Sequence, residues 1–273
     1  MREMTLKDIQ QVSLDILKDV HDFCVKNGIK YTLQGGTLLG AVRHHGFIPW
    51  DDDIDIAMPR SDYDRFIRSY KSDKGFRLLS RELKDDVYIP YSRVCEMEKT
   101  YVDASVVPWT SGKTGVWIDV FPLDGISRSY KKSLKIIRIA RFYWYQENIQ
   151  RTAMVPISSI PNLKKRIRQI VKKILVLFCR KDALDRHIKI CKSIKFENAE
   201  FYCNLAFLRY GIRERHRKKV IDSLILTPFE GDLFYIMAGY DEALHEKYGD
   251  YMELPPFEER IQGHDMNIYY WIK

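Results

Sequence analysis

The chain has 273 residues, of which 45% are hydrophobic and 13% aromatic, so it can bury a sizeable core in one large domain or in one domain with a helical extension. The same composition excludes a disordered polypeptide. The formal net charge of +8 is unevenly distributed: residues 128–181 contain fifteen Lys or Arg and one acidic residue, whereas the remainder contains thirty basic and thirty-six acidic residues.

An amphipathic helix is predicted near the N-terminus. Thr5 to Asp8 resembles a capping box, and apolar residues then recur at helical spacing until Asn27-Gly28 ends the helix. No apolar core of a signal peptide precedes it, and the longest apolar run of the basic segment, residues 174–179, is too short to span a bilayer. We therefore expect the protein to stay in the cytosol.

Five cysteines are scattered along the chain without any Cys-x-x-Cys spacing. The odd number and the spacing argue against a zinc site and against a disulfide framework. Reduced and mostly buried thiols are expected at Cys24, Cys95, Cys179, Cys191 and Cys203.

A bend at two glycines follows the first helix. The β-like run 31–34 stops at Gly35 and Gly36, and a helix-compatible run, residues 37–44, comes next. A strand that turns into a helix in this way presents free backbone N–H groups and the positive end of the helix dipole. Because glycine also lets a ligand approach the backbone closely, the bend predicts a phosphate-binding site.

An acidic cluster follows at Asp51, Asp52, Asp53 and Asp55. Residues 53–56 alternate aspartate with isoleucine, as a half-buried strand does, so Asp53 and Asp55 are expected on one face, about 7 Å apart. Two such carboxylates repel each other unless a cation lies between them. Hard oxygen ligands of this kind favour Mg²⁺ or Mn²⁺.

A third aspartate, Asp119, lies in an apolar strand predicted over residues 115–121. A lone carboxylate in a buried strand needs a partner, and a metal ion is the economical candidate. Taken alone, four aspartates in five residues are more typical of a solvated acidic loop. The glycine bend, the alternation with isoleucine and Asp119 together favour a site that combines a metal with a phosphate.

The residues around this cluster follow ordinary patterns. A helix opens at Pro59 and carries aromatic residues on one side, which packing suffices to explain. Short strands are predicted over residues 77–79, 88–94 and 100–102.

The basic segment, residues 128–181, is predicted to contain two helices separated by a break at 154–161. In the second helix, apolar residues occupy one face and basic residues the rest. The apolar residues are Leu163, Ile167, Ile170, Val171, Ile174, Leu175 and Phe178, and the basic ones are Lys164, Lys165, Arg166, Arg168, Lys172 and Lys173. This pattern is typical of a membrane-surface helix. A core-packing helix and a nucleic-acid-binding helix are the alternatives, but the segment has no RNA- or DNA-binding motif, so no nucleic-acid partner is expected.

The last third of the chain is predicted to be mixed. His187 and His216 are isolated among cations and are interpreted as surface residues. Two helices are expected first, then a turn between short strands, a closing helix and an extended tail, at 183–194, 199–209, 227–231, 240–248 and 253–260.

Several motifs together resemble the LicD family of phosphotransferases, which is related to the fukutin-type enzymes. The motifs are Gly35-Gly36-Thr37-Leu38-Leu39-Gly40-Ala41-Val42-Arg43-His44, Pro49-Trp50-Asp51-Asp52-Asp53-Ile54-Asp55, Pro90-Tyr91-Ser92-Arg93, Val116-Trp117-Ile118-Asp119-Val120-Phe121-Pro122-Leu123-Asp124 and Tyr248-Gly249-Asp250-Tyr251-Met252-Glu253-Leu254-Pro255-Pro256. The resemblance implies an α+β fold: a nucleotidyltransferase-like mixed β-sheet core flanked by helices, with an added basic helical segment. We expect a catalytic core over residues 1–125, the basic helical segment over 126–225, and C-terminal strands, helix and tail over 226–273.

The resemblance also implies a reaction. The donor is a CDP-linked alcohol, CDP-choline in the best-known branch. The phospho-alcohol is moved onto a sugar hydroxyl of a cell-surface glycan precursor, such as that of a teichoic acid or a lipopolysaccharide, and CMP is released. Since this acceptor is membrane-linked, we expect peripheral contact with the anionic inner face of the plasma membrane through residues 128–181.

Residue roles follow from the pattern and the resemblance together. The catalytic and metal-binding residues are Asp53, Asp55 and Asp119, with Asp119 acting as third Mg²⁺ ligand, as base for the acceptor hydroxyl, or as both. Donor phosphates are expected on the backbone N–H groups of Gly35, Gly36 and Thr37.

Further donor contacts are expected nearby. Arg43 would neutralise the leaving nucleotide, and His44 is a second candidate for a donor contact. Trp50, Asp51 and Asp52 would shape the donor pocket, with direct metal contact by Asp51 left open. In the resemblance Arg93 or its neighbourhood faces the donor, although a cross-strand ion pair is the alternative. Lys113, in the turn before the Asp119 strand, reaches a phosphate or is an ordinary hairpin lysine.

Two other functions remain open. A nucleotidyltransferase of the same fold would move a nucleoside monophosphate and release pyrophosphate. A non-catalytic protein that binds polyanionic chains would leave the three aspartates unexplained. The sequence also leaves glycerol phosphate and ribitol phosphate as alternatives to choline phosphate.

Overall fold

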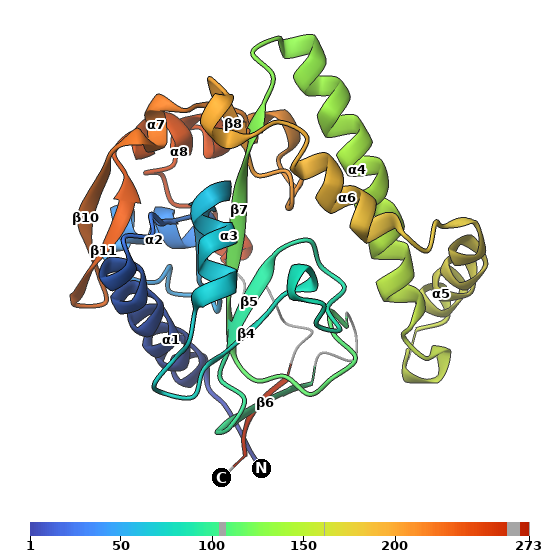
Figure 1. Cartoon of the computed structure of the whole chain (residues 1–273). Coiled ribbons are helices and arrows are strands. Elements are labelled where there is room, and N and C mark those ends of the chain that lie inside the picture. The colour runs from blue at the N-terminus through green and yellow to red at the C-terminus, as the bar shows by residue number, and fades with distance from the viewer. Residues whose placement is uncertain (104–107, 161, 261–267, 273) are drawn as a thin grey trace.

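Strand β7 (Trp117–Ile126) runs through the centre of the molecule in the computed structural model, which describes residues 1–103, 108–160, 162–260 and 268–272 (Figure 1). It pairs in parallel with β3 (Asp55–Pro59) and antiparallel with β5 (Ser92–Cys95). β2 (Thr32–Leu33) and β4 (Arg77–Leu79) complete the order β2-β3-β7-β5-β4. This mixed sheet with flanking helices confirms the predicted α+β class.

The central position of β7 follows from its composition. All its residues after Trp117 are buried, as expected for a strand that is covered on both faces. The strand is longer than predicted and continues to Ile126. Its one other acidic residue, Asp124, is fully buried and accepts two hydrogen bonds from Arg60, with Nε–Oδ1 and Nη2–Oδ2 distances of 2.7 and 2.8 Å. This ion pair explains how β7 tolerates a second buried charge.

Three helices pack around the sheet: α1 (Leu6–Asn27), α2 (Gly35–His44) and α3 (Arg60–Ser69). The predicted capping box of α1 is confirmed, since Thr5 and Asp8 accept hydrogen bonds from each other's backbone N–H. Gly28 ends α1 in the left-handed conformation, with φ +58°. Their inward residues, with those of the sheet, form the main apolar core.

The C-terminal part returns to this core. A hairpin joins β10 (Leu224–Phe229) and β11 (Asp232–Met237), and the closing helix α8 spans Tyr240–Tyr248 as predicted. The short helix α7 (Lys219–Asp222) precedes the hairpin. A small sheet that the sequence did not predict joins both chain ends near β6, in the order β1 (Arg2–Glu3), β12 (Ile268–Trp271) and β6 (Thr100–Asp103).

The basic segment forms a helical arm beside the sheet (Figure 1). The basic segment forms α4 (Tyr130–Ala153) and α5 (Leu163–Leu175), and α6 (Ala183–Cys191), just after it, completes the arm. In this view α5 lies farthest from β7. Residues of α4 and α6 share a second, smaller apolar core with Ile126 at the end of β7. The predicted boundary near residue 125 coincides with this change of core but stays a prediction.

Two expectations for the last third of the chain are wrong. Residues 199–209 do not form a helix, because β8 (Phe201–Cys203) pairs with the end of β7, where a free strand edge and aromatic side chains favour pairing. β9 (His216–Arg217) pairs with β8 in turn, and the 3₁₀ helix η5 (Gly211–Glu214) lies between them.

The second wrong expectation concerns His187 and His216, which are buried rather than on the surface. In His187, Nδ1 lies 2.7 Å from Glu147 Oε1, and Nε2 lies 2.9 Å from the Leu205 carbonyl oxygen. His216 Nδ1 lies 2.7 Å from Glu246 Oε2. Each histidine contacts a carboxylate that is distant in the sequence. The charges of its sequence neighbours therefore do not predict that it is buried.

The expectation for the cysteines is confirmed: all five are free, and only Cys179 is not buried. Among the described residues, no helix is both long and apolar enough to cross a membrane.

Candidate active site

The N-terminus of α2 lies against the acidic cluster. Gly35 has a φ of +60°, and a Cβ atom there would lie 2.8 Å from Asp55 Oδ2. A Cβ atom on Gly36 would lie 2.6 Å from Asp51 Oδ2. A side chain at either glycine would therefore force the facing carboxylate to move. The two carboxylates approach the first turn of the helix, where the leading N–H groups have no intrahelical partner.

The strand after the acidic cluster begins at Asp55, two residues later than predicted. Ile54 is nevertheless fully buried between the half-buried Asp53 and Asp55, so the predicted alternation holds. The Asp55 N–H donates to Thr37 Oγ1 at 2.8 Å, and the Gln34 N–H donates to the Asp55 carbonyl oxygen at 2.9 Å. The glycine bend and the aspartate strand are thus tied together through the backbone.

The third aspartate lies beside the second. Asp55 and Asp119 are register partners in the parallel pair of β3 and β7, and the Asp119 N–H donates to the Ile54 carbonyl oxygen at 2.9 Å. Residues 64 positions apart in the sequence thus meet opposite the start of α2. The structure brings together the glycine bend and the aspartates that the sequence singled out.

The electrostatics of the cluster are unfavourable as it stands. The pKa of Asp55 is raised well above its ordinary value, first by burial and then by the carboxylates of Asp53, Asp119 and Asp51, while Lys247 partly opposes the shift. Repulsion of this kind is relieved by a cation, and the carboxylate oxygens are the donors that Mg²⁺ or Mn²⁺ prefers.

In the described part of the chain, no three His, Cys, Asp or Glu side chains are already arranged to hold a metal ion. Magnesium sites often use only one or two protein carboxylates and take further oxygens from substrate phosphates. Asp53 and Asp55 are the residues that fit this use. Asp119 is engaged by Arg93, although a carboxylate that accepts two hydrogen bonds keeps free lone pairs.

Arg93 and Asp119 form a cross-strand ion pair, which was one of the two interpretations of this arginine. They are register partners on β5 and β7, with Nε–Oδ1 and Nη2–Oδ2 distances of 2.6 and 3.3 Å. The guanidinium also lies over the rings of Trp117 and Trp109, at 4.2 and 4.5 Å from their centroids. Arg93 therefore fixes the orientation of Asp119, and its contact with a donor stays a prediction.

Arg43 binds the chain's own C-terminal segment. Its Nη1 donates to the carbonyl oxygens of Tyr251 and Glu253, at 2.8 and 3.1 Å, and its Nε donates to His44 Nε2 at 3.0 Å. Burial, followed by the charge of Arg260, lowers the pKa of Arg43, and burial, followed by the charge of Arg43, lowers the pKa of His44. His44 is thus a neutral acceptor here, and the predicted nucleotide contacts of both residues compete with these interactions.

The other predicted donor residues lie in different settings. Asp52 is buried, and the Asp51 carbonyl oxygen accepts a hydrogen bond from Gln10 Nε2 at 2.8 Å. Trp50 is half-buried, with the Arg260 guanidinium 5.7 Å from its ring centroid. Lys113 is exposed in the segment before β7, and its role stays a prediction.

Sequence reasoning missed Lys247, which is close enough to Asp55 to lower its pKa. Its ammonium group lies 2.8 Å from Glu214 Oε1, and both side chains are nearly inaccessible to solvent. Lys247 and Gly35 also line the same small cavity of about 10 Å³. The only signal in the sequence was its position directly before the Tyr248-Gly249 motif.

Comparison with known proteins identifies the family of the chain. Residues 28–167 match the model of the family described as LicD/FKTN/FKRP, nucleotidyltransferase domain, which covers the glycine bend and all three aspartates. Over 98% of its length the chain is similar to the lipopolysaccharide cholinephosphotransferase LicD of Haemophilus influenzae, with 31% identity and 99% of that protein covered. The ribitol 5-phosphate transferases FKRP of Homo sapiens and Mus musculus are 55% identical over 31 residues, which are 11% of this chain and 6% of each relative.

Proposed function

Because the chain belongs to the LicD/FKTN/FKRP family of nucleotidyltransferase-fold proteins, we propose that it is a phosphotransferase that moves phosphocholine from CDP-choline onto a sugar hydroxyl of a cell-surface glycan. CMP is the second product. The observation that carries the proposal is the register pair of Asp55 and Asp119 opposite the glycine bend of α2.

The residues of this site suit phosphoryl transfer, which needs positioning and charge neutralisation more than covalent chemistry. The backbone N–H groups of Gly35, Gly36 and Thr37 hold the donor diphosphate at the positive end of α2. Asp53 and Asp55 hold Mg²⁺, which when bound neutralises phosphate charge. Lys247 adds a cation beside Asp55.

In the transfer step, the acceptor oxygen forms a bond to the phosphorus that carries choline. The bond from this phosphorus to the CMP oxygen breaks, and CMP leaves with the electron pair. The acceptor hydroxyl gives its proton to Asp119, which Arg93 holds in place through a 2.6 Å hydrogen bond.

The choice of choline rests on the relatives. The similarity to a cholinephosphotransferase extends over almost the whole chain, whereas that to the ribitol 5-phosphate transferases covers 31 residues. Three of the aromatic residues that a choline cage could use, Tyr91, Trp109 and Trp117, already surround Arg93. CDP-glycerol and CDP-ribitol are therefore the donors to test beside CDP-choline.

The test is product analysis. The pure protein is incubated with Mg²⁺, a glycan acceptor and CDP-choline, CDP-glycerol or CDP-ribitol, and CMP is measured. The proposal expects most CMP from CDP-choline. Pyrophosphate from CTP would instead support the nucleotidyltransferase alternative, and no product from any donor, together with glycan binding, would support the non-catalytic one.

The membrane-linked acceptor would be reached through α5. This helix turns its apolar residues outward: Leu163, Ile167 and Ile174 are 72%, 54% and 53% exposed. The residue buried on α5 is instead Gln169, whose Nε2 donates to the carbonyl oxygens of Thr152 and Val155. An exposed apolar face flanked by lysines argues against the core-packing alternative and favours peripheral binding to an anionic membrane at the cytoplasmic side.

A further inference from the structure

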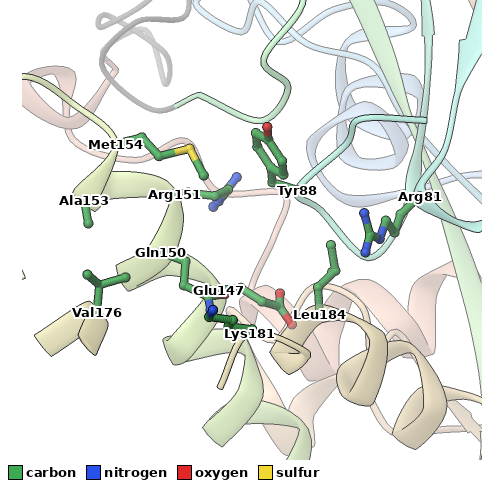
Figure 2. Close-up of a pocket in the computed structure, with 10 residues that line it drawn as sticks. All are labelled: Arg81, Tyr88, Glu147, Gln150, Arg151, Ala153, Met154, Val176, Lys181 and Leu184. Carbon is green, nitrogen blue, oxygen red and sulfur yellow. The ribbon is translucent and has the colours of Figure 1, made fainter. Parts of the chain in front are cut away.

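A cavity of about 460 Å³ lies between the helical arm and the sheet domain, outside the acidic cluster (Figure 2). Its size falls in the range of about 300–1,000 Å³ that small-molecule sites occupy. Its lining comes from α4, from the 3₁₀ helix η3 (Val176–Phe178), from α6 with the residues before it, and from η1 (Arg81–Leu83) and Tyr88 across the gap.

The charge of this lining is positive. Arg81, Arg151 and Lys181 contribute three cations against one carboxylate, Glu147. Glu147 already pairs with His187, at 2.7 Å, a residue that does not line the cavity, so its charge is compensated. Arg81 is paired with Asp185, but Lys181 is exposed, which leaves the cavity with an excess of positive charge.

Arg151 is the residue that points to a ligand. Its Nη2 donates to Asn148 Oδ1 at 2.6 Å, whereas its Nε is buried and has no hydrogen-bond partner among the described residues. A buried donor of this kind is normally satisfied, and a charged donor forms its strongest hydrogen bonds with anionic oxygens. The cavity is also lined by Tyr88, Met154 and Leu184, which offer apolar surface of the kind on which a sugar ring packs.

Charges of the proposed reaction centre act on a residue of this cavity. The charges of Arg93 and Asp119 both act on Arg151, so the inner wall of the cavity lies within electrostatic reach of the proposed base. At the other end, Val176 lines the cavity, and the next residues, Leu177 and Phe178, are 79% and 80% exposed. The cavity thus lies within electrostatic reach of the reacting strand and borders the apolar surface of the arm.

We propose that this cavity is the acceptor site and binds a sugar that carries a phosphate group, with Arg151 and Lys181 as its anion ligands. This assignment rests on the proposed function for its biological meaning, but binding can be measured without it. The lipid of a membrane-linked acceptor would leave the cavity beside Leu177 and Phe178.

The experiment measures binding of glucose 1-phosphate, glucose and inorganic phosphate to the full chain by ligand-observed NMR, with no donor present. The sugar phosphate is expected to bind at least tenfold more tightly than either other probe. Lys181→Glu, an exposed position that folding tolerates, and Arg151→Gln are each expected to weaken binding at least tenfold. Arg138→Gln, on the exposed side of α4, is the matched control and should bind as the wild type does.

The outcomes test the sugar-phosphate site independently of the proposed transfer reaction. Equal binding by the wild type and Lys181→Glu overturns the site even if CMP is released from CDP-choline. Loss of binding in Lys181→Glu supports the site even if no CDP-alcohol is a donor. Tight binding of inorganic phosphate without preference for the sugar overturns the assignment to a sugar. If the same Lys181 dependence appears only with a lipid-linked sugar phosphate in micelles, the lipid is part of the recognised acceptor.

Discussion

Asp55 and Asp119 face each other across the parallel strands β3 and β7, and Arg93 faces Asp119 from the antiparallel strand on the other side. Three strands thus place two carboxylates that repel each other, and an arginine that pairs with one of them, in a single row. This row, opposite the glycine bend of α2, is the part of the molecule on which the proposed chemistry depends.

Asp55→Asn is expected to abolish transfer and to raise the thermal stability of the metal-free protein. The pKa of Asp55 is raised on folding, by burial first and by the neighbouring carboxylates next. Stability is therefore lost as pH rises through this raised value, and at neutral pH the charge destabilises the fold. The measurement is Tm in EDTA together with CMP release. A rise of a few degrees is expected, since about 1 kcal/mol shifts Tm by about 2–4 °C in chains of this size.

The control for this variant is Asp73→Asn, at an exposed position of the loop after α3, which should change neither quantity. Wild-type turnover in Asp55→Asn would end the assignment of this carboxylate to the reaction. A lower Tm in EDTA would show that the acidic row is not repulsive.

Gly35→Ala is expected to weaken donor binding in addition to its backbone strain. The new Cβ atom would lie 2.8 Å from Asp55 Oδ2, so the carboxylate must move. Gly28→Ala is the matched control, because its φ of +58° imposes similar strain while nothing lies within 4 Å. Both variants should lose roughly 1–2 kcal/mol of stability. Calorimetric titration with CDP-choline and Mg²⁺ should show a loss of donor affinity in Gly35→Ala alone. Equal donor affinities of Gly35→Ala and Gly28→Ala would contradict donor binding at the glycine bend.

Arg93→Gln is expected to cost about 3–5 kcal/mol of stability, because it leaves the buried carboxylate of Asp119 without its partner. The double variant Arg93→Met, Asp119→Asn should recover much of this stability and still release no CMP. Arg60→Gln breaks the other buried pair on β7 and serves as the control. It should lower Tm by a similar amount but leave the KM of the folded protein for the donor unchanged.

Replacing Ile167 and Ile174 by Asp is expected to reduce binding to vesicles that contain phosphatidylglycerol by at least tenfold. Both residues lie on the exposed apolar face of α5. Wild-type binding should also weaken in 0.5 M NaCl, since each lysine near an anionic surface contributes about 1 kcal/mol that salt screens. Ile225→Asp, an exposed apolar residue of β10, is the control. Absence of vesicle binding in the wild type would disprove the proposed membrane contact of α5.

His187→Gln is expected to destabilise the protein more at pH 6 than at pH 9. Burial alone would lower the pKa of His187, but Cys191 and Glu147 outweigh it and hold this pKa well above its ordinary 6.5. Its contribution to stability is therefore complete below about pH 6.5 and is lost as pH rises through the raised value. Glu147→Gln should reduce the same pH dependence. A Tm difference between wild type and His187→Gln that is constant with pH would disprove the charged pair.

The features of the fold that could be predicted depend on residues that lie close together in the sequence. The capping box at Thr5 and Asp8, the closing helix α8 and the strand around Asp119 each depend on residues that are neighbours in the sequence. Two glycines before an acidic strand also marked the candidate site, because glycine and alternating aspartates have few other uses together.

The rest depends on contacts between distant residues. Glu214 and Lys247 are 33 positions apart, and His187 meets Glu147 across 40. β8 exists because the end of β7 offers it an edge, which overrides a helix-like pattern. The cavity wall at Arg151 also could not be foreseen, because it arises only where α4 lies across from η1 and Tyr88.

Anomalous diffraction from crystals grown with Mn²⁺ and CDP-choline would show where the metal and the donor bind. A metal peak is expected at coordination distance from Asp53 and Asp55, about 2.1 Å, with the donor diphosphate against the N–H groups of Gly35 and Gly36. A bound donor whose metal lies away from both carboxylates, or whose phosphates lie away from the start of α2, would contradict this assignment of the site.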